Sequence, residues 1–111
     1  MNTTNLLILI GNIGQDPRQV GSTVKLSVAT NRSWSDQNGQ RKTATDWVTV
    51  TIFGGKTADF VLENVRKGDV VSIKARVADG SYERDGNRHF STDVIAETVD
   101  LITPRAASAA G

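Results

Sequence analysis

Apolar and polar residues alternate in several short segments of the chain, and such alternation predicts half-buried β-strands. An apolar run near residues 5–12, which a glycine closes, predicts a buried first strand. Alternating segments predict further strands near 23–31, 46–53 and 69–77, and a last strand near 91–102. The residues expected to face the core in the middle strands are Val24, Leu26, Val28, Val48, Val50, Ile52, Val71, Ile73, Ala75 and Val77.

The segment "KTADFVLENVRKGD" changes to helical spacing and predicts one helix after the third strand. Thr57 is the expected N-cap, and Gly68 is expected to end the helix in a left-handed conformation. Arg66 and Lys67 are then expected in the last turn, where cations favour the helix dipole. The apolar residues that recur at i, i+3, i+4 and i+7 are Ala58, Val61, Leu62 and Val65.

The order β, β, β, α, β, β is the order of a five-stranded Greek-key barrel, the OB-fold, and predicts an all-β domain over residues 1–103. A small sandwich with an added helix is the alternative. The hairpin "DGSYERDGNRHF" is expected to contain two glycine turns, and the long polar segment between the second and third strands is expected to be a loop. Residues 104–111, which are small and featureless, are expected to form a short flexible tail.

Composition excludes several classes of site. The chain has 111 residues and a formal charge of +1, which neither requires nor forbids a nucleic-acid partner. It has no cysteine and one histidine, His89, so disulfides, thiolate metal sites and the usual zinc or histidine-triad sites lack their parts. No cofactor or metal is expected. The run Leu6–Ile10 is too short to cross a membrane, and residues 1–5 carry no basic residue of a signal peptide. The chain is expected to be soluble and intracellular.

The strand "DWVTVTIF" carries a second, unusual face. Its aliphatic residues face the core, so Trp47 and Phe53 lie on the opposite face with threonines between them. The corresponding faces of the neighbouring strands carry Lys25 and, in the fourth strand, Lys74 and Arg76. Nucleobases stack on aromatic rings with about 1–3 kcal/mol per base, and cations follow the phosphates. Base faces are accessible only in single strands, so this face predicts sequence-independent binding of single-stranded DNA.

Other aromatic and basic residues gather in two polar segments. Trp34 ends the second strand and Trp47 begins the third, and Tyr82 lies in the last hairpin. Together with the strand face, these segments predict a DNA-binding surface, which explains why both tryptophans flank polar sequence. The predicted DNA-binding residues are Trp34, Trp47, Phe53, Tyr82, Lys25, Arg32, Arg41, Lys42, Lys74, Arg76, Arg84 and Arg88.

Each aromatic residue also has a simpler interpretation. Trp47 and Phe53 could cover a subunit interface, Trp34 could fold onto the barrel rim, and Tyr82 could be a cross-strand aromatic that stabilises the hairpin. Phe60 is expected to pack at the edge of the helix, and Phe90 to pack within a strand. His89 is expected to be an exposed residue at a strand end.

The chain resembles the bacterial-type single-stranded DNA-binding proteins over residues 5–102. The resemblance implies an OB-fold protomer, assembly as a homotetramer, binding without chemistry, and a role in DNA replication, repair and recombination at the bacterial nucleoid in the cytoplasm. It adds Lys56, after "FGG", to the expected DNA-binding residues. The matching segments are "LILIGNIGQDP", "LSVATNRSW", "DWVTVTIFG", "TADFVLENVRKGDVV" and "YERDGNRHFSTDVIAETVDLI".

Three departures from the family pattern change the expectations. The first hairpin is shortened to "RQVGST", and Asp79 near Tyr82 would repel phosphate. The family's flexible linker and acidic tip do not follow "AASAAG", so recruitment of replication proteins through an acidic tail is not expected. A dimer is the alternative to the tetramer, because the shortened hairpin could alter one interface.

Three other functions compete with single-stranded DNA binding. A primosomal or other accessory OB-fold module would recruit a replication partner and would need fewer stacking aromatics. RNA could bind in the same groove, since stacking does not distinguish the two nucleic acids. A nuclease would need clustered carboxylates, whereas Asp16, Asp36 and Asp46 lie at turns or loop ends and are explained by turn chemistry.

Overall fold

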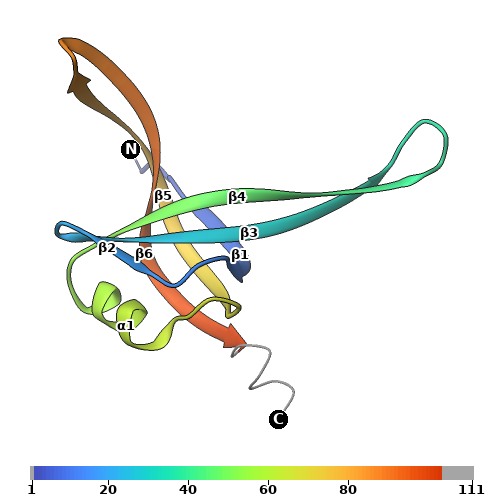
Figure 1. The fold of residues 1–111 in the computed structure, drawn as a ribbon, viewed down its shortest axis with the longest axis horizontal. Coiled ribbons are helices and arrows are strands. Elements are labelled where there is room, and N and C mark those ends of the chain that lie inside the picture. Colours follow the sequence, from blue (N-terminus) through green and yellow to red (C-terminus); the bar gives the residue numbers. More distant parts are fainter. Residues whose placement is uncertain (1, 104–111) are drawn as a thin grey trace.

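The computed structural model describes residues 2–103, which form a small barrel with one helix and two projecting hairpins (Figure 1). The sheet order is β1-β5-β6-β4-β3-β2, and pairing of β1 with β3 closes the barrel. Five long strands with a helix after the third confirm the predicted OB-fold, and the three-residue β2 is an additional strand. The elements are β1 Leu7–Ile13, β2 Arg18–Val20, β3 Thr23–Ser35, β4 Arg41–Phe53, α1 Lys56–Asn64, β5 Val70–Arg84 and β6 Asn87–Thr103.

The barrel closes where β1 crosses β3. Asn12 and Ile13 pair with Ala29 and Val28, while the rest of β1 pairs with β5. A Cβ atom on Gly11 would overlap the carbonyl oxygen of Ala29 and lie 2.9 Å from Cγ1 of Val28. Glycine therefore allows the two backbones to approach closely enough to close the barrel.

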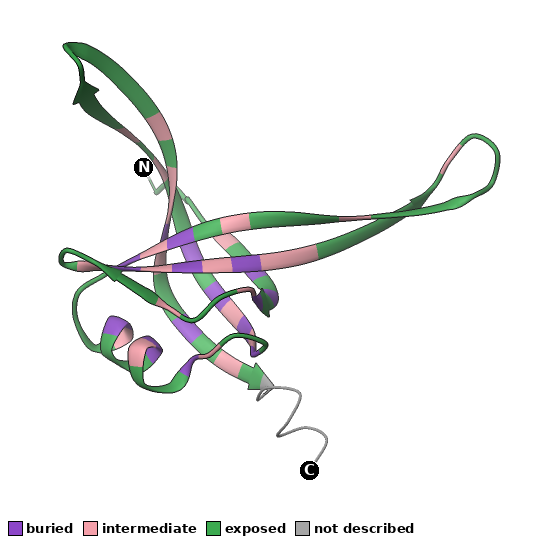
Figure 2. Ribbon diagram, viewed as in Figure 1, coloured by how far each residue is buried: buried purple, intermediate pink, exposed green. Residues whose placement is uncertain are grey.

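The core lies inside the barrel and under α1, as the buried segments in Figure 2 show. The alternation of β3 and β4 predicted this core correctly, although Val48 is only partly buried. Val77 is an exception, since 37% of it is exposed. It lies at the base of a projecting hairpin, beyond the region that the barrel encloses. The buried residues of the core are Leu9, Ile13, Val24, Leu26, Val28, Val50, Ile52, Ala58, Val61, Val65, Val71, Ile73, Ala75 and Val99.

The polar segment between the barrel parts of β3 and β4 is a two-stranded ribbon, where the sequence predicted a loop. Pairing continues without interruption to Ser35 and Arg41, so the ribbon projects far from the barrel (Figure 1). Only residues 36–40 form the turn, in which Oδ1 of Asp36 accepts the N–H groups of Asn38 and Gln40 at 2.9 and 2.8 Å. Polar residues here form strands because backbone pairing, rather than burial, holds them.

The second projecting hairpin joins β5 to β6 (Figure 1). It turns only at Asp85 and Gly86, both with positive φ. The second predicted glycine turn is wrong, because Gly80 lies within β5 and pairs with Ser91. At the base of this hairpin the side chain of Asn5 donates to the carbonyl of Val77 at 2.7 Å and accepts its N–H at 3.0 Å.

Both predicted caps of α1 are wrong. Gly55 is the N-cap and makes no side-chain hydrogen bond, while Thr57 lies inside the helix. The helix ends at Asn64, so Gly68, which has a φ of 94°, lies in a later turn and donates its N–H to the carbonyl of Ile13 at 2.8 Å. This contact ties the turn after α1 to the end of β1.

Arg66 and Lys67 lie beyond the last helical turn rather than in it. The guanidinium of Arg66 nevertheless donates to the carbonyls of Leu62 and Val65 at 2.8 and 2.7 Å, which satisfies acceptors at the helix end. The buried carboxylate of Asp69 accepts the N–H of Arg66 at 2.8 Å.

Within residues 2–103, no helix has the length and apolar character needed to span a membrane. The predicted tail, 104–111, lies outside the described residues.

Candidate nucleic-acid interface

The non-core side of the β3–β4 pair within the barrel, here called the outer face, carries two exposed aromatic rings. Residues directly opposite in an antiparallel pair share a face. Trp47 lies opposite Ala29, and Phe53 lies opposite Thr23. These rings are 61% and 54% exposed, as the parity of β4 predicted. The shorter pairs Ser27–Thr49 and Lys25–Thr51 lie between them.

Trp47 rests against the backbone at the end of β1. A Cβ atom on Gly14 would overlap the indole of Trp47 and lie 2.8 Å from its Cη2 atom. Gly14 is itself fixed, because its N–H donates to the carbonyl of Ser27 at 2.9 Å. One side of the indole is therefore supported by backbone while most of the ring stays exposed, which preorganises it for stacking.

Cations lie on the outer face in a row that crosses the strands. The register places Arg76 opposite Ile95, Ile95 opposite Thr51, and Thr51 opposite Lys25. Lys25 is half-buried and donates to the hydroxyl of Thr51 at 2.6 Å. Lys25 is in turn opposite Arg18 of β2. The row therefore brings two predicted residues, Lys25 and Arg76, onto one face with Trp47 and Phe53.

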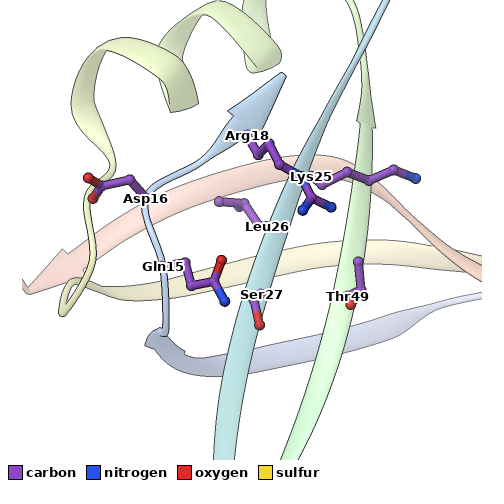
Figure 3. Close-up of a pocket in the computed structure, with 7 residues that line it drawn as sticks. All are labelled: Gln15, Asp16, Arg18, Lys25, Leu26, Ser27 and Thr49. Carbon is purple, nitrogen blue, oxygen red and sulfur yellow. The ribbon is translucent and has the colours of Figure 1, made fainter. Parts of the chain in front are cut away.

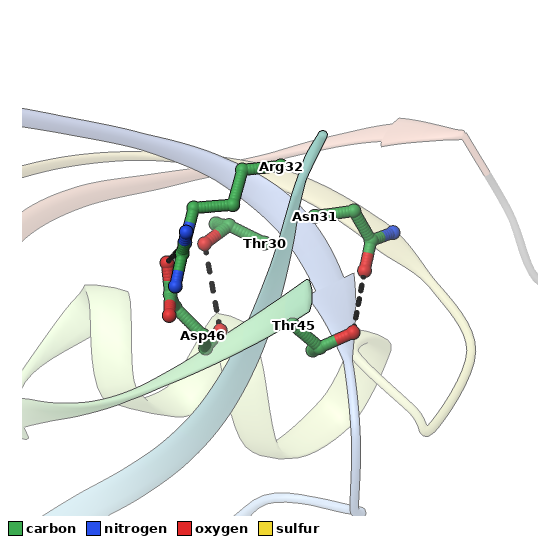
Figure 4. Close-up of polar contacts among 5 residues, drawn as sticks. All are labelled: Thr30, Asn31, Arg32, Thr45 and Asp46. Atoms are coloured by element: carbon green, nitrogen blue, oxygen red, sulfur yellow. Dashed lines mark hydrogen bonds and ion pairs between the residues drawn. The ribbon is translucent and has the colours of Figure 1, made fainter. Parts of the chain in front are cut away.

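Trp34 lies on the other side of the β3–β4 ribbon from Trp47, because their positions differ in parity along an unbroken ladder. Its ring is 43% exposed, and the guanidinium of Arg32 lies 4.9 Å from its centroid, a cation–π contact. Nε of Arg32 also donates to Oδ2 of Asp46 at 2.9 Å (Figure 4). Lys42 is opposite Trp34, with its Nζ 4.0 Å from Oδ2 of Asp36.

Hydrogen bonds between side chains join the two strands of the ribbon near Trp34 and Arg32. The hydroxyl of Thr45 donates to the side-chain oxygen of Asn31 at 2.8 Å (Figure 4). Nearer the tip, Arg41 donates to the hydroxyl of Ser33 at 2.8 Å. Arg41 therefore lies near the turn, on the ribbon side continuous with the outer face.

The β5–β6 hairpin carries a stacked pair of rings. Tyr82 lies opposite His89, with ring centroids 5.2 Å apart and planes inclined by 21°. Tyr82 remains 51% exposed, so the pair is a cross-strand contact that also offers an open ring. Arg84 and Arg88 are exposed near the tip of this hairpin, opposite Asn87 and Glu83.

Two predicted cations lie apart from these groups. Lys74 shares its face of β5 with Arg76, but it lies opposite Ile8 of β1, beside exposed aliphatic residues rather than beside the aromatic rings. Lys56 is exposed at the first position of α1, three residues after Phe53. The predicted surface is thus divided among the outer face and the two hairpins.

Sequence reasoning missed two residues of this surface. Phe90, expected to pack within a strand, is 77% exposed, because it lies in the part of the β5–β6 hairpin that projects beyond the barrel and exposes both faces. Arg18 lies in β2, which is too short to show periodicity. The sequence did indicate that Lys25 faces away from the core. Any strand that pairs with β3 at this position therefore places one of its residues beside Lys25, and in the structure that residue is Arg18. Phe60 is 37% exposed on α1.

No three His, Cys, Asp or Glu side chains gather as a metal-binding group within residues 2–103.

Residues 4–102 match the model of the single-strand binding protein family. The chain is 32% identical to the single-stranded DNA-binding protein of Neisseria meningitidis serogroup A, over 96% of this chain and 64% of that protein. It is 33% identical to the mitochondrial single-stranded DNA-binding protein of Drosophila melanogaster, over 87% of this chain and 70% of that protein.

The fold is similar to that of the Plasmodium falciparum SSB in its complex with ssDNA. The TM-score is 0.75 at 24% identity, and the superposition covers 93% of this chain and 96% of that chain. At this identity the likeness concerns the fold alone. Because the family model covers almost every described residue, the chain belongs to the single-strand binding protein family.

Proposed function

We propose that this chain binds single-stranded DNA without sequence preference and protects it during replication, recombination and repair. The observation that carries the proposal is the outward exposure of Trp47 and Phe53 on a face that also presents Lys25 and Arg76. Exposed rings of this size have an unfavourable contact with water, and base stacking removes it with about 1–3 kcal/mol per base. The names of the Neisseria and Drosophila relatives support the same ligand.

The proposed path uses all three aromatic groups. A strand would stack bases on Trp47 and Phe53, pass around the edge of the β3–β4 ribbon to Trp34 on its other side, and reach Tyr82 on the β5–β6 hairpin. Arg41, Lys42, Lys56, Arg84 and Arg88 would meet its phosphates along the way. Arg32 would do so only after leaving Asp46, and Lys74 is proposed as a peripheral contact.

The direct test is binding of labelled oligo(dT), followed by anisotropy, against a duplex of the same length. The protein should prefer the single strand, because duplex bases stack on one another and present no free faces. An oligo(rU) of equal length tests the RNA alternative. Equal affinity for single strand and duplex would contradict stacking and leave only general attraction to phosphate.

Self-association is a second part of the proposal, and we infer a homotetramer, with a dimer as the alternative. From Leu7 to Gly11, β1 pairs with β5 on one side, and no strand of residues 2–103 pairs with its other edge. Leu6, Ile8 and Ile10 are 53%, 60% and 56% exposed. A free edge beside an apolar row suits pairing with a second copy about a two-fold axis. Sedimentation equilibrium measures the mass, and a monomer would contradict both assemblies.

The proposed binding involves no covalent chemistry, and it is placed in the bacterial cytoplasm at the nucleoid. The Neisseria relatives support a bacterial setting, while the Drosophila relative is mitochondrial. The chain spans 64% of the length of each Neisseria relative, so those proteins contain segments without a counterpart here.

A further inference from the structure

A small cavity lies beside the outer face, between the segment that follows β1 and the barrel part of β3 and β4 (Figure 3). Its volume is about 150 Å³. Cationic, amide and hydroxyl side chains form most of its lining, so it is rich in hydrogen-bond donors. The lining residues are Gln15, Asp16, Arg18, Lys25, Leu26, Ser27 and Thr49.

Two cationic residues occupy neighbouring positions at this cavity. Arg18 and Lys25 are direct partners in the β2–β3 pair. Like charges at directly opposite positions destabilise a sheet. Neither cation forms an ion pair with any residue in 2–103, and Lys25 donates only to the hydroxyl of Thr51. A bound anion would relieve this repulsion, and the fork of Arg18 fits two oxygens of a phosphate.

The one acid of the lining is engaged elsewhere. Oδ1 of Asp16 accepts the backbone N–H of Lys67 at 2.8 Å. In Figure 3 its carboxylate points away from the side chains of Arg18 and Lys25. The side-chain amide of Gln15 and the hydroxyls of Ser27 and Thr49 remain as neutral lining groups. The cavity is therefore suited to a single anionic group.

The cavity lies between the two stacking rings of the outer face. Trp47 and Phe53 are six residues apart in β4, which is about 20 Å along a strand. A DNA strand that stacks a base on each ring must carry its phosphates past the intervening Ser27–Thr49 and Lys25–Thr51 pairs. We propose that Arg18, Lys25 and Gln15 hold one backbone phosphate of the bound strand in this cavity. This inference rests on the proposed function and assigns Arg18 a role in it.

The test compares Arg18→Gln with Lys67→Gln in oligo(dT) titrations at several salt concentrations. Both substitutions remove one positive charge, but the side chain of Lys67 does not line the cavity. Arg18→Gln should weaken binding about 3- to 10-fold at low salt and reduce the salt slope by about 0.7, the value for one phosphate on a single strand. Lys67→Gln should change neither by a comparable amount. Arg18→Lys should recover the slope but only part of the affinity.

A second measurement separates a phosphate contact from an indirect effect on the rings. On an oligo(dT) with uncharged methylphosphonate linkages, Arg18→Gln should have no effect, while Trp47→Ala should still weaken binding. If the two charge variants weaken oligo(dT) binding equally, or if Arg18→Gln also weakens binding of the uncharged strand, the cavity does not hold a phosphate. The proposed function would survive that result. Failure of the unaltered protein to bind oligo(dT) would overturn both.

Discussion

At the scale of single residues, three exposed rings each have one supported side. Trp47 lies on the backbone of Gly14, Trp34 lies under the guanidinium of Arg32, and Tyr82 stacks on His89. Such support fixes the orientation of a ring before a ligand arrives, so less entropy is lost on binding. The three supports are chemically different: backbone, a cation and a second ring.

Replacing either ring of the outer face with alanine should weaken oligo(dT) binding by about 1–3 kcal/mol, the stacking energy of one base. Phe53→Ala and Phe60→Ala form a matched pair, since both remove a phenylalanine and only Phe53 lies on the outer face. Anisotropy titrations should detect a loss for Phe53→Ala alone. If Phe53→Ala instead changes the assembly and leaves the intrinsic affinity unchanged, the interface interpretation of this ring is right.

Asp46→Asn should strengthen oligo(dT) binding a few-fold, because it removes a negative charge and releases Arg32 from an exposed ion pair. The pair is exposed on both sides, so its loss should change the free energy of unfolding by less than about 1 kcal/mol. Asp59→Asn on α1 removes the same charge away from the ribbon. Equal effects of the two substitutions on affinity would contradict a role for Asp46 as a local restraint on Arg32.

At the scale of elements, apolar periodicity predicted the parts of the fold that are buried. Val24, Leu26 and Val28 alternate because one face of β3 lies in the core. The same logic fails for Asn31–Ser35 and for Arg41–Asp46, where the ribbon has no buried face and polar sequence is compatible with either strand or loop. The caps of α1 were missed because tertiary contacts of the following turn, such as that of Gly68 with Ile13, decide where the helix ends.

For the candidate site too, the sequence predicted the residues on strands with one buried face and missed others. Parity alone identified Trp47, Phe53 and Lys25, because these residues lie on strands with one buried face. It could not identify Arg18, whose face depends on strand pairing, or the exposure of Phe90, which depends on how far the β5–β6 hairpin projects from the barrel. Pairing partners and the length of a projecting hairpin are set by contacts between distant segments, which one sequence does not reveal.

The β5–β6 hairpin should depend on Asn5, which bonds both backbone groups of Val77 at its base. Asn5→Ala removes both bonds and should accelerate amide hydrogen exchange at Val77 while the barrel amides keep their protection. Asn5→Asp retains the acceptor for the N–H of Val77 and should cause a smaller change. Uniform acceleration across the barrel would show that Asn5 stabilises the whole fold rather than the hairpin.

At the scale of the whole molecule, the barrel presents two surfaces with different chemistry. The outer face of β3 and β4 carries aromatic and cationic residues, whereas β1 presents Leu6, Ile8 and Ile10 beside an unpaired edge. The register of β1 with β5 brings Lys74 next to Ile8, so this cation borders the proposed assembly surface. This division predicts that the proposed DNA binding and the proposed self-association can be altered separately.

Ile8→Glu should dissociate the assembly, since it places a charge on the apolar row of β1. The side chain is 60% exposed in the single chain, so the barrel should remain folded. Sedimentation equilibrium should give a smaller mass than for the unaltered protein, and circular dichroism should keep its strand signal. Asn64→Glu, at an exposed position on α1, is the control. An unchanged mass for Ile8→Glu would exclude β1 as the interface.

The measurement that tests the central claim most directly is a titration with oligo(dT) that follows intrinsic tryptophan fluorescence at low and high salt. The chain has two tryptophans, Trp34 and Trp47, and both are exposed. The account predicts strong quenching as bases stack on the indoles, with affinity that falls as salt rises. Trp47→Ala should remove part of that signal. Absence of both binding and quenching would contradict the account. It would favour the alternative in which the exposed tryptophans lie at an interface between proteins.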